Sequence, residues 1–228
     1  MPSLAPFKRR WMQFSLRGLL FATLIAAVGL GTLTPTLRRA NQQRALVAMV
    51  EKQGGVVLYD FERTRSWIGG PRQHPDNNTR LRKLLGDDFF DRVVAVEIGA
   101  RSYSYRSSAT PALDDDGFRL ITALSELRTL KVAESRLTDE GAKRVSGLVN
   151  LEELRLSSPF IAEGTLEAIT RLPKLRRLAL TAPEITDSAI ETIGSMKDLQ
   201  QVDLRGTRIT REGLNRLHQL LPKTWINH

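Results

Sequence analysis

Apolar residues recur at a fixed spacing of 24 through the C-terminal part of the chain. Blocks that start at Leu127, Leu151, Leu175 and Leu199 each carry apolar residues at their first, fourth and sixth positions, the pattern L-x-x-L-x-L. Positions four and six alternate as in a strand, whereas apolar columns at sixteen, nineteen and twenty-two recur as on one face of a helix. Each block therefore predicts a strand, a turn and a helix, and stacked blocks predict one continuous core.

The repeat register extends beyond these four blocks. Val93, Val96 and Ile98 fit the strand of an earlier repeat that carries ten extra residues within 99–112, and Trp225-Ile226 fits a sixth strand. We therefore expect six strands and five helix-bearing repeats between residues 93 and 228. The predicted helix N-caps are residues whose side chains can accept a backbone hydrogen bond: Asp114, Thr138, Thr186 and Thr210.

The motif resembles that of a known family. Ile185-Thr186-Asp187-Ser188 and residues 207–214, Thr-Arg-Ile-Thr-Arg-Glu-Gly-Leu, look like the repeats of bacterial leucine-rich repeat proteins with a single N-terminal membrane anchor. This resemblance implies an α/β solenoid of 24-residue strand-turn-helix repeats, with a curved parallel sheet whose concave face binds partners. The ninth position departs from the common asparagine, so we expect no buried asparagine ladder; it holds Ser135, Pro159, Pro183 and Thr207.

An uncharged segment precedes the repeats. Residues 18–37 contain no charged side chain and are flanked by Arg17 and Arg38. Twenty residues span about 30 Å as a helix, which matches the hydrocarbon thickness of a bilayer and predicts a transmembrane helix. A cleaved signal peptide or a buried soluble helix would also fit an apolar segment of this kind. Because long downstream domains cross membranes largely regardless of their charge, we expect the C-terminal domain to lie outside the cytoplasm.

The predicted organisation has four parts: a basic segment (1–17), the transmembrane helix (18–37), a juxtamembrane and capping region (38–92) and the repeat domain (93–228). Within the third part, we expect a helix over 38–53 that ends at Gly54-Gly55, a strand over 56–61, a loop over 62–79 and a short helix over 81–90.

Charge is concentrated at the start of the chain. The net charge of +9 suggests nucleic acid or an anionic membrane as a partner. Residues 1–60, however, hold eight basic and two acidic side chains, whereas residues 93–228 hold nineteen and eighteen. The excess therefore lies around the predicted anchor, where basic residues meet lipid head groups, and does not predict nucleic-acid binding by the repeats.

The residues give no support for catalysis or for a cofactor. The chain has no cysteine, and its three histidines are far apart. No hydrolase, metalloprotease or phosphate-loop motif is present. Asp114-Asp115-Asp116-Gly117 lacks the remaining ligands of a calcium loop, so we interpret Asp114 as a helix cap. We expect no enzyme activity, no metal and no cofactor.

Two segments are candidate contact surfaces. Positions three, five and seven of each block should project from the concave face, which is typical of recognition by repeat proteins. The candidate residues on this face are Lys131, Glu153, Arg155, Arg177, Gln201, Asp203 and Arg205. The inserted segment pairs tyrosine with arginine, a composition typical of contact loops; its candidates are Arg101, Tyr103, Tyr105 and Arg106.

The favoured hypothesis is a membrane-anchored, non-catalytic module that binds a protein, peptide or envelope polymer through the concave sheet. A self-associating envelope scaffold and a cytoplasm-facing adaptor are the alternatives. The sequence leaves the oligomeric state open.

Overall fold

A computed structural model describes residues 36–60, 91–99 and 113–228 of the chain. By contact, the chain separates into two compact units, residues 1–40 and 41–228. The described residues leave out most of the predicted transmembrane segment, the loop over 62–79, the short helix over 81–90 and the contact loop with Arg101 and Tyr103. Within the described ranges, no helix is both long and apolar enough to cross a membrane.

The second unit contains a seven-stranded sheet whose strands follow one another in chain order. The strands are β1 (Val56–Tyr59), β2 (Val93–Ile98), β3 (Thr129–Val132), β4 (Glu153–Ser157), β5 (Arg177–Thr181), β6 (Gln201–Asp203) and β7 (Trp225–Asn227). Strands β2 to β7 are parallel, and their register advances by 24 residues from β3 onward, as the repeat pattern predicts. Strand β1 adds to the N-terminal edge and runs antiparallel to β2, a direction that the apolar pattern alone did not predict.

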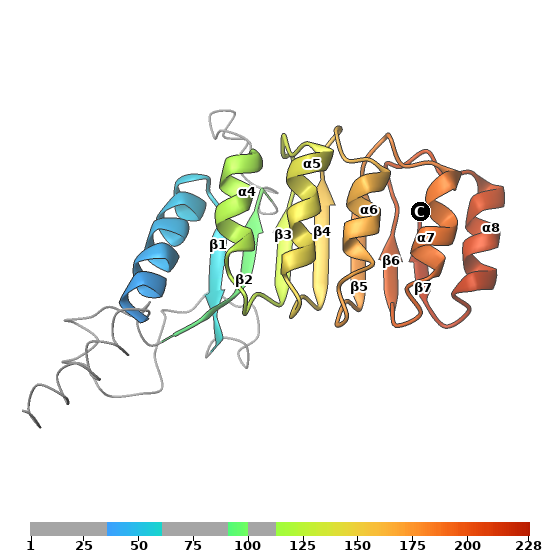
Figure 1. Cartoon of the computed structure of the whole chain (residues 1–228). Helices are drawn as coiled ribbons and strands as arrows, with labels where there is room; N and C mark the ends of the chain where they lie inside the picture. The colour runs from blue at the N-terminus through green and yellow to red at the C-terminus, as the bar shows by residue number, and fades with distance from the viewer. Residues whose placement is uncertain (1–35, 61–90, 100–112) are drawn as a thin grey trace, which may run out of the picture. The chain divides into compact units, whose positions relative to one another are not determined.

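Helical segments connect the parallel strands and lie along one face of the sheet (Figure 1). They are α4 (Asp115–Thr122), α5 (Asp139–Ala142) with the 3₁₀ segment η2 (Lys143–Gly147), α6 (Glu163–Ile169), η3 (Asp187–Ala189) with α7 (Ile190–Gly194), and α8 (Arg211–Leu220). This gives the five helix-bearing repeats that the sequence predicts. The architecture is leucine-rich-repeat-like, with a parallel sheet on one side and helices on the other.

The repeated apolar positions form one core between the sheet and the helices. Leu130, Leu154, Leu178 and Val202 each have 1% or less of their surface exposed, and they align across adjacent parallel strands. The first helix of the unit, whose described residues run to 52, contributes Leu46, Val47 and Val50 to the same core. It ends where Gly54 adopts a positive φ of 69°, a conformation that glycine adopts without strain.

Predicted helix caps are present in three repeats. The side chains of Asp114, Thr138 and Thr210 accept hydrogen bonds from the backbone N–H three residues ahead. Thr186 also stands at the predicted N-cap position, before η3, but its side chain makes no cap bond. Its hydroxyl instead lies 2.8 Å from the hydroxyl of Ser188, and the segment begins as a 3₁₀ turn.

Carboxylates at the thirteenth position of the repeat join each helix start to the next one. Asp115 accepts bonds from the backbone N–H and the hydroxyl of Thr138, at 2.9 and 2.6 Å. Asp187 accepts the same pair of bonds from Thr210, at 2.7 and 2.6 Å. Between these two, Glu163 accepts from the hydroxyl of Ser188. The acidic residue at this position therefore holds the start of the helical segment in the next repeat.

Asp139 shows the same function where the following repeat lacks its own cap. Ala162 occupies the N-cap position of α6 and cannot accept a hydrogen bond through its side chain. Asp139 Oδ1 accepts instead from the backbone N–H groups of Ala162 and Thr165, at 3.0 and 2.9 Å. Burial would raise the pKa of Asp139, but the hydrogen bonds from Thr165 and Ala162 outweigh it, and the pKa lies below its usual value.

Candidate functional site

The sheet presents an open face, defined here as the face away from α4–α8 and formed by the strand residues that alternate with the core positions. The register aligns these residues in rows across the strands. One row contains Glu97, Lys131, Arg155, Ala179, Asp203 and Asn227. A second row contains Thr129, Glu153, Arg177, Gln201 and Trp225. The seven concave-face candidates thus share one surface, with Arg205 directly after β6.

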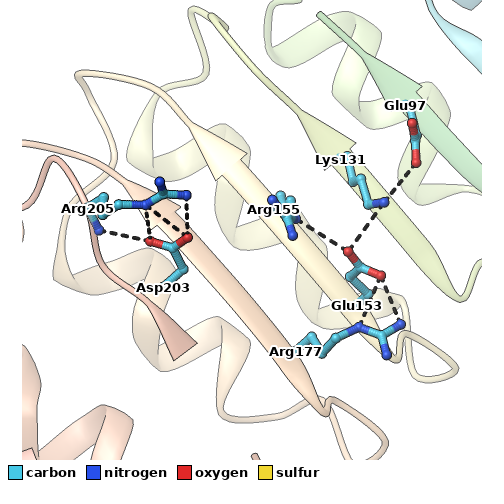
Figure 2. Close-up of polar contacts among 7 residues, drawn as sticks. All are labelled: Glu97, Lys131, Glu153, Arg155, Arg177, Asp203 and Arg205. Carbon is cyan, nitrogen blue, oxygen red and sulfur yellow. Dashed lines mark hydrogen bonds and ion pairs between the residues drawn. The ribbon is translucent and has the colours of Figure 1, made fainter. Parts of the chain in front are cut away.

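Ion pairs run across four adjacent strands of the open face (Figure 2). Lys131 Nζ lies 2.9 Å from Glu97 Oε1 and 3.4 Å from Glu153 Oε1. Glu153 also accepts from Arg177, whose Nε and Nη2 lie 3.1 and 2.9 Å from Oε2. Arg155 Nε donates to Glu153 Oε1 at 3.3 Å, a longer distance than those of Arg177. One carboxylate therefore serves three cations.

A separate ion pair lies at the end of β6. Arg205 Nε and Nη2 lie 3.0 and 2.7 Å from the two carboxylate oxygens of Asp203. The backbone N–H of Arg205 also donates to Asp203, at 3.2 Å. This two-oxygen contact fixes the plane of the guanidinium group.

The carboxylates of the open face are buried, whereas the guanidinium groups reach solvent. The side chains of Glu97, Glu153 and Asp203 are 4%, 10% and 10% exposed. Those of Arg155 and Arg177 are both 48% exposed, and that of Arg205 is 65% exposed. The surface that a partner would meet is therefore cationic, although acidic groups lie directly beneath it.

Two of the buried carboxylates, those of Glu153 and Asp203, stay ionised at neutral pH. Burial raises the pKa of Glu153, but the charges of Lys131 and Arg177 outweigh it, so the pKa lies below its usual value. Burial likewise raises the pKa of Asp203, and the hydrogen bonds and charge of Arg205 reverse that effect. These two carboxylates therefore keep their negative charge over the physiological pH range.

A pocket of about 410 Å³ opens on this face across β3 to β6. Its lining includes Lys131, Arg155, Thr181, Asp203 and Arg205. Ala179 of β5, which stands between β4 and β6, also lines it. The hollow exists because a methyl group stands in the register between the longer side chains of Arg155 and Asp203. With strands about 4.8 Å apart, those two backbones are separated by roughly 10 Å, enough for one inserted side chain.

Two contributors to the open face were missed by sequence reasoning. Glu97 lies in β2, ahead of the regular 24-residue blocks, yet it pairs in register with Lys131. Trp225 was interpreted only as part of a terminal strand, but its row position next to Gln201 places it on the open face, where it is 58% exposed. Applying the rule for positions three, five and seven to the first and last strands would have found both.

The structure describes some of the other residues that the sequence suggested as functional. Asp114 is a helix cap, as expected. Among the described residues, no group of three or more histidine, cysteine or acidic side chains could hold a metal ion. Arg101, Tyr103, Tyr105 and Arg106 lie outside the described residues, so their function as a contact loop stays a prediction.

No protein-family model matches the chain, and no curated protein matches it. Among solved structures, the chain is similar to a leucine-rich repeat protein of Leptospira interrogans, LIC12759. They share 28% identity with a TM-score of 0.35, over 48% of this chain and 27% of that one. It is also similar to an internalin of Listeria monocytogenes, with 20% identity and a TM-score of 0.32, over 43% of this chain and 28% of that one. The matches thus span about a quarter of each of these proteins, and the leucine-rich-repeat-like fold rests on the repeat register of the chain itself.

Proposed function

We propose that the chain is a non-catalytic interaction module that binds a protein or peptide partner through the open face of its repeat sheet. The observation that carries this proposal is the set of exposed guanidinium groups on buried carboxylates, arranged around a pocket. Ion pairing fixes arginine side chains before a partner arrives, so less conformational entropy is lost on binding. Arginine and tryptophan are also the residues that most often dominate binding energy at protein interfaces.

We propose in addition that residues 18–37 anchor the module in a membrane, with the repeats outside the cytoplasm. The support is the length of the uncharged segment and its basic flanks. An alkaline wash of isolated membranes tests the anchor, because an integral protein stays in the pellet whereas a peripheral one is released. A phosphatase reporter fused after His228 tests the orientation: activity would support it, and an inactive reporter made in full would contradict it.

Affinity capture with paired charge variants tests the binding function. Arg155→Gln/Arg177→Gln removes two exposed cations from the open face, and Arg119→Gln/Arg171→Gln removes two exposed cations outside it. Both variants change the net charge equally. We expect a partner recovered by in-cell crosslinking of the unmodified chain to be lost only from the open-face variant. Recovery of the same partner at the same yield by both variants would contradict the proposal.

Self-association is a second candidate function, and one observation favours it. Strand β7 stands at the edge of the sheet and carries the exposed Trp225, and edge strands can pair with another chain. Sedimentation of the full chain in a non-ionic detergent discriminates between the two functions. Concentration-dependent dimers that Trp225→Ala abolishes would support self-association, whereas monomers at all concentrations would exclude it.

A further inference from the structure

We infer that the pocket around Ala179 binds an acidic side chain, aspartate or glutamate, of an extended polypeptide segment. This inference rests on the proposed function, because it names the chemistry of the partner that the open face would bind. It is carried by the charge balance of the pocket, by its shape and by the contacts of Arg155.

Among the described residues, the ion-pair network on the open face holds one more cation than carboxylates. Glu97 and Glu153 provide two negative charges, whereas Lys131, Arg155 and Arg177 provide three positive ones. Asp203 and Arg205 balance each other through a two-oxygen contact. The described residues of this network therefore carry a net charge of +1, which a bound carboxylate would balance.

Arg155 holds the weakest position in this network. It shares Glu153 with two other cations, and its contact of 3.3 Å is longer than the shortest contact of Lys131, 2.9 Å to Glu97, or of Arg177, 2.9 Å to Glu153. Its two terminal nitrogens, with four N–H groups, take no part in that bond. A guanidinium group can bind a carboxylate through two parallel hydrogen bonds, so Arg155 can hold Glu153 and an incoming carboxylate at once.

A second guanidinium, that of Arg205, lines the same pocket as the guanidinium of Arg155. The small side chains of Ala179 and Thr181 leave the space between them open. Strands β3 to β6 span three strand spacings, about 14 Å, which equals the length of about four extended residues. An extended segment that crosses the strands can therefore insert one acidic side chain above Ala179.

Fluorescence anisotropy with three labelled peptides tests the inference on the full chain in a non-ionic detergent. The peptides have eight residues and alternate glycine with glutamate, glutamine or lysine, and the label is a zwitterionic rhodamine. We expect saturable binding of the glutamate peptide, at least about tenfold tighter than the glutamine peptide, and none of the lysine peptide. Equal binding of the glutamate and glutamine peptides, or no binding of the glutamate peptide, would overturn the inference.

Variants of the chain locate the site. Arg155→Gln and Ala179→Gln should each weaken binding of the glutamate peptide at least about fivefold, the first by removing donors and the second by filling the pocket. Arg171→Gln and Thr170→Gln, both at exposed positions that follow α6, are the controls for charge and for side-chain size, and neither should change the affinity. Unchanged binding by Arg155→Gln with an unaltered melting temperature would contradict the inference. Tighter binding of an eight-nucleotide oligothymidylate would also overturn it, in favour of a phosphate polymer.

These results separate the inference from the proposed function. If crosslinked partners depend on the open face but the glutamate peptide does not bind, the inference that the pocket binds an acidic side chain is wrong, and the proposed interaction function stands. If the peptide binds while partner capture ignores the open face, the interaction module is wrong and the pocket stands.

Discussion

Replacing Gly141 by alanine tests the carboxylate contacts that join consecutive repeats. Alanine inside a helix is normally more stable than glycine by about 1 kcal/mol. At Gly141, however, an added Cβ would lie 1.9 Å from Oδ1 and 2.2 Å from Cγ of Asp115. Because the clash reaches Cγ, the whole Asp115 carboxylate must turn away, and both of its bonds to Thr138 are lost.

The magnitude follows from these opposing effects. Two hydrogen bonds to a charged acceptor, at about 1.5 kcal/mol each, give a loss of about 3 kcal/mol. The gain in helix propensity offsets about 1 kcal/mol of this loss. We therefore expect Gly141→Ala to lower the free energy of unfolding by about 2 kcal/mol, which corresponds to about 4–8 °C in melting temperature for a chain of this size.

Gly147 provides a matched control within the same repeat. It ends the 3₁₀ segment η2, and a Cβ added there would meet nothing within 4 Å. Gly147→Ala should therefore leave the melting temperature, followed by circular dichroism, unchanged or slightly raised. In the background of Asp115→Ala, Gly141→Ala should no longer destabilise the chain. A Gly141→Ala variant as stable as the unmodified chain would refute this account of the repeat contacts.

Three further predictions concern the core, the charges and the exposed tryptophan. Leu178→Ala should lower the free energy of unfolding by about 3 kcal/mol in urea titrations, because its side chain is 1% exposed and leaves a cavity; a loss below about 1 kcal/mol would contradict a continuous core. The lowered pKa values of Asp139, Glu153 and Asp203 mean that these carboxylates stabilise the fold above their unfolded pKa values of about 4, and that this stability is lost as the pH falls through the lower folded values. The urea midpoint should therefore be nearly constant from about pH 7 to 5 and fall steeply below about pH 4, less so in Asp139→Asn; a midpoint that rises on acidification would be inconsistent with these contacts. Trp225→Ala should leave the melting temperature within about 2 °C, because the side chain is 58% exposed, but weaken partner capture in the crosslinking assay; full capture would remove Trp225 from the interface.

The repeat register could be predicted from sequence because the core dictates it. A core residue such as Leu154 must alternate with solvent-facing neighbours in a strand, and this apolar pattern recurs every 24 residues. The alternation also placed Arg155 and Arg177 on the open face correctly. The direction of β1 could not be predicted, because a short apolar strand pairs equally well either way until its neighbours are known.

The charge network required the structure. Whether Arg177 binds Glu153 or projects alone depends on cross-strand distances and side-chain conformations, which the spacing of residues does not specify. The contact of Asp115 with Thr138 was also missed, because the pair Asp114-Asp115 at a helix start has a sufficient local explanation as a cap and a first-turn acid. Both are contacts between neighbouring repeats, and they become visible only when the repeats are stacked.

Site-specific photocrosslinking tests the central claim, binding through the open face, most directly. A photoreactive residue replaces Thr181, which lines the pocket, or Glu167, an exposed residue of α6, in intact cells that express the full chain. The account predicts a discrete crosslinked protein from position 181 that is absent from position 167 and disappears when Arg155→Gln is added. A crosslinked partner at position 167 with none at position 181 would contradict it.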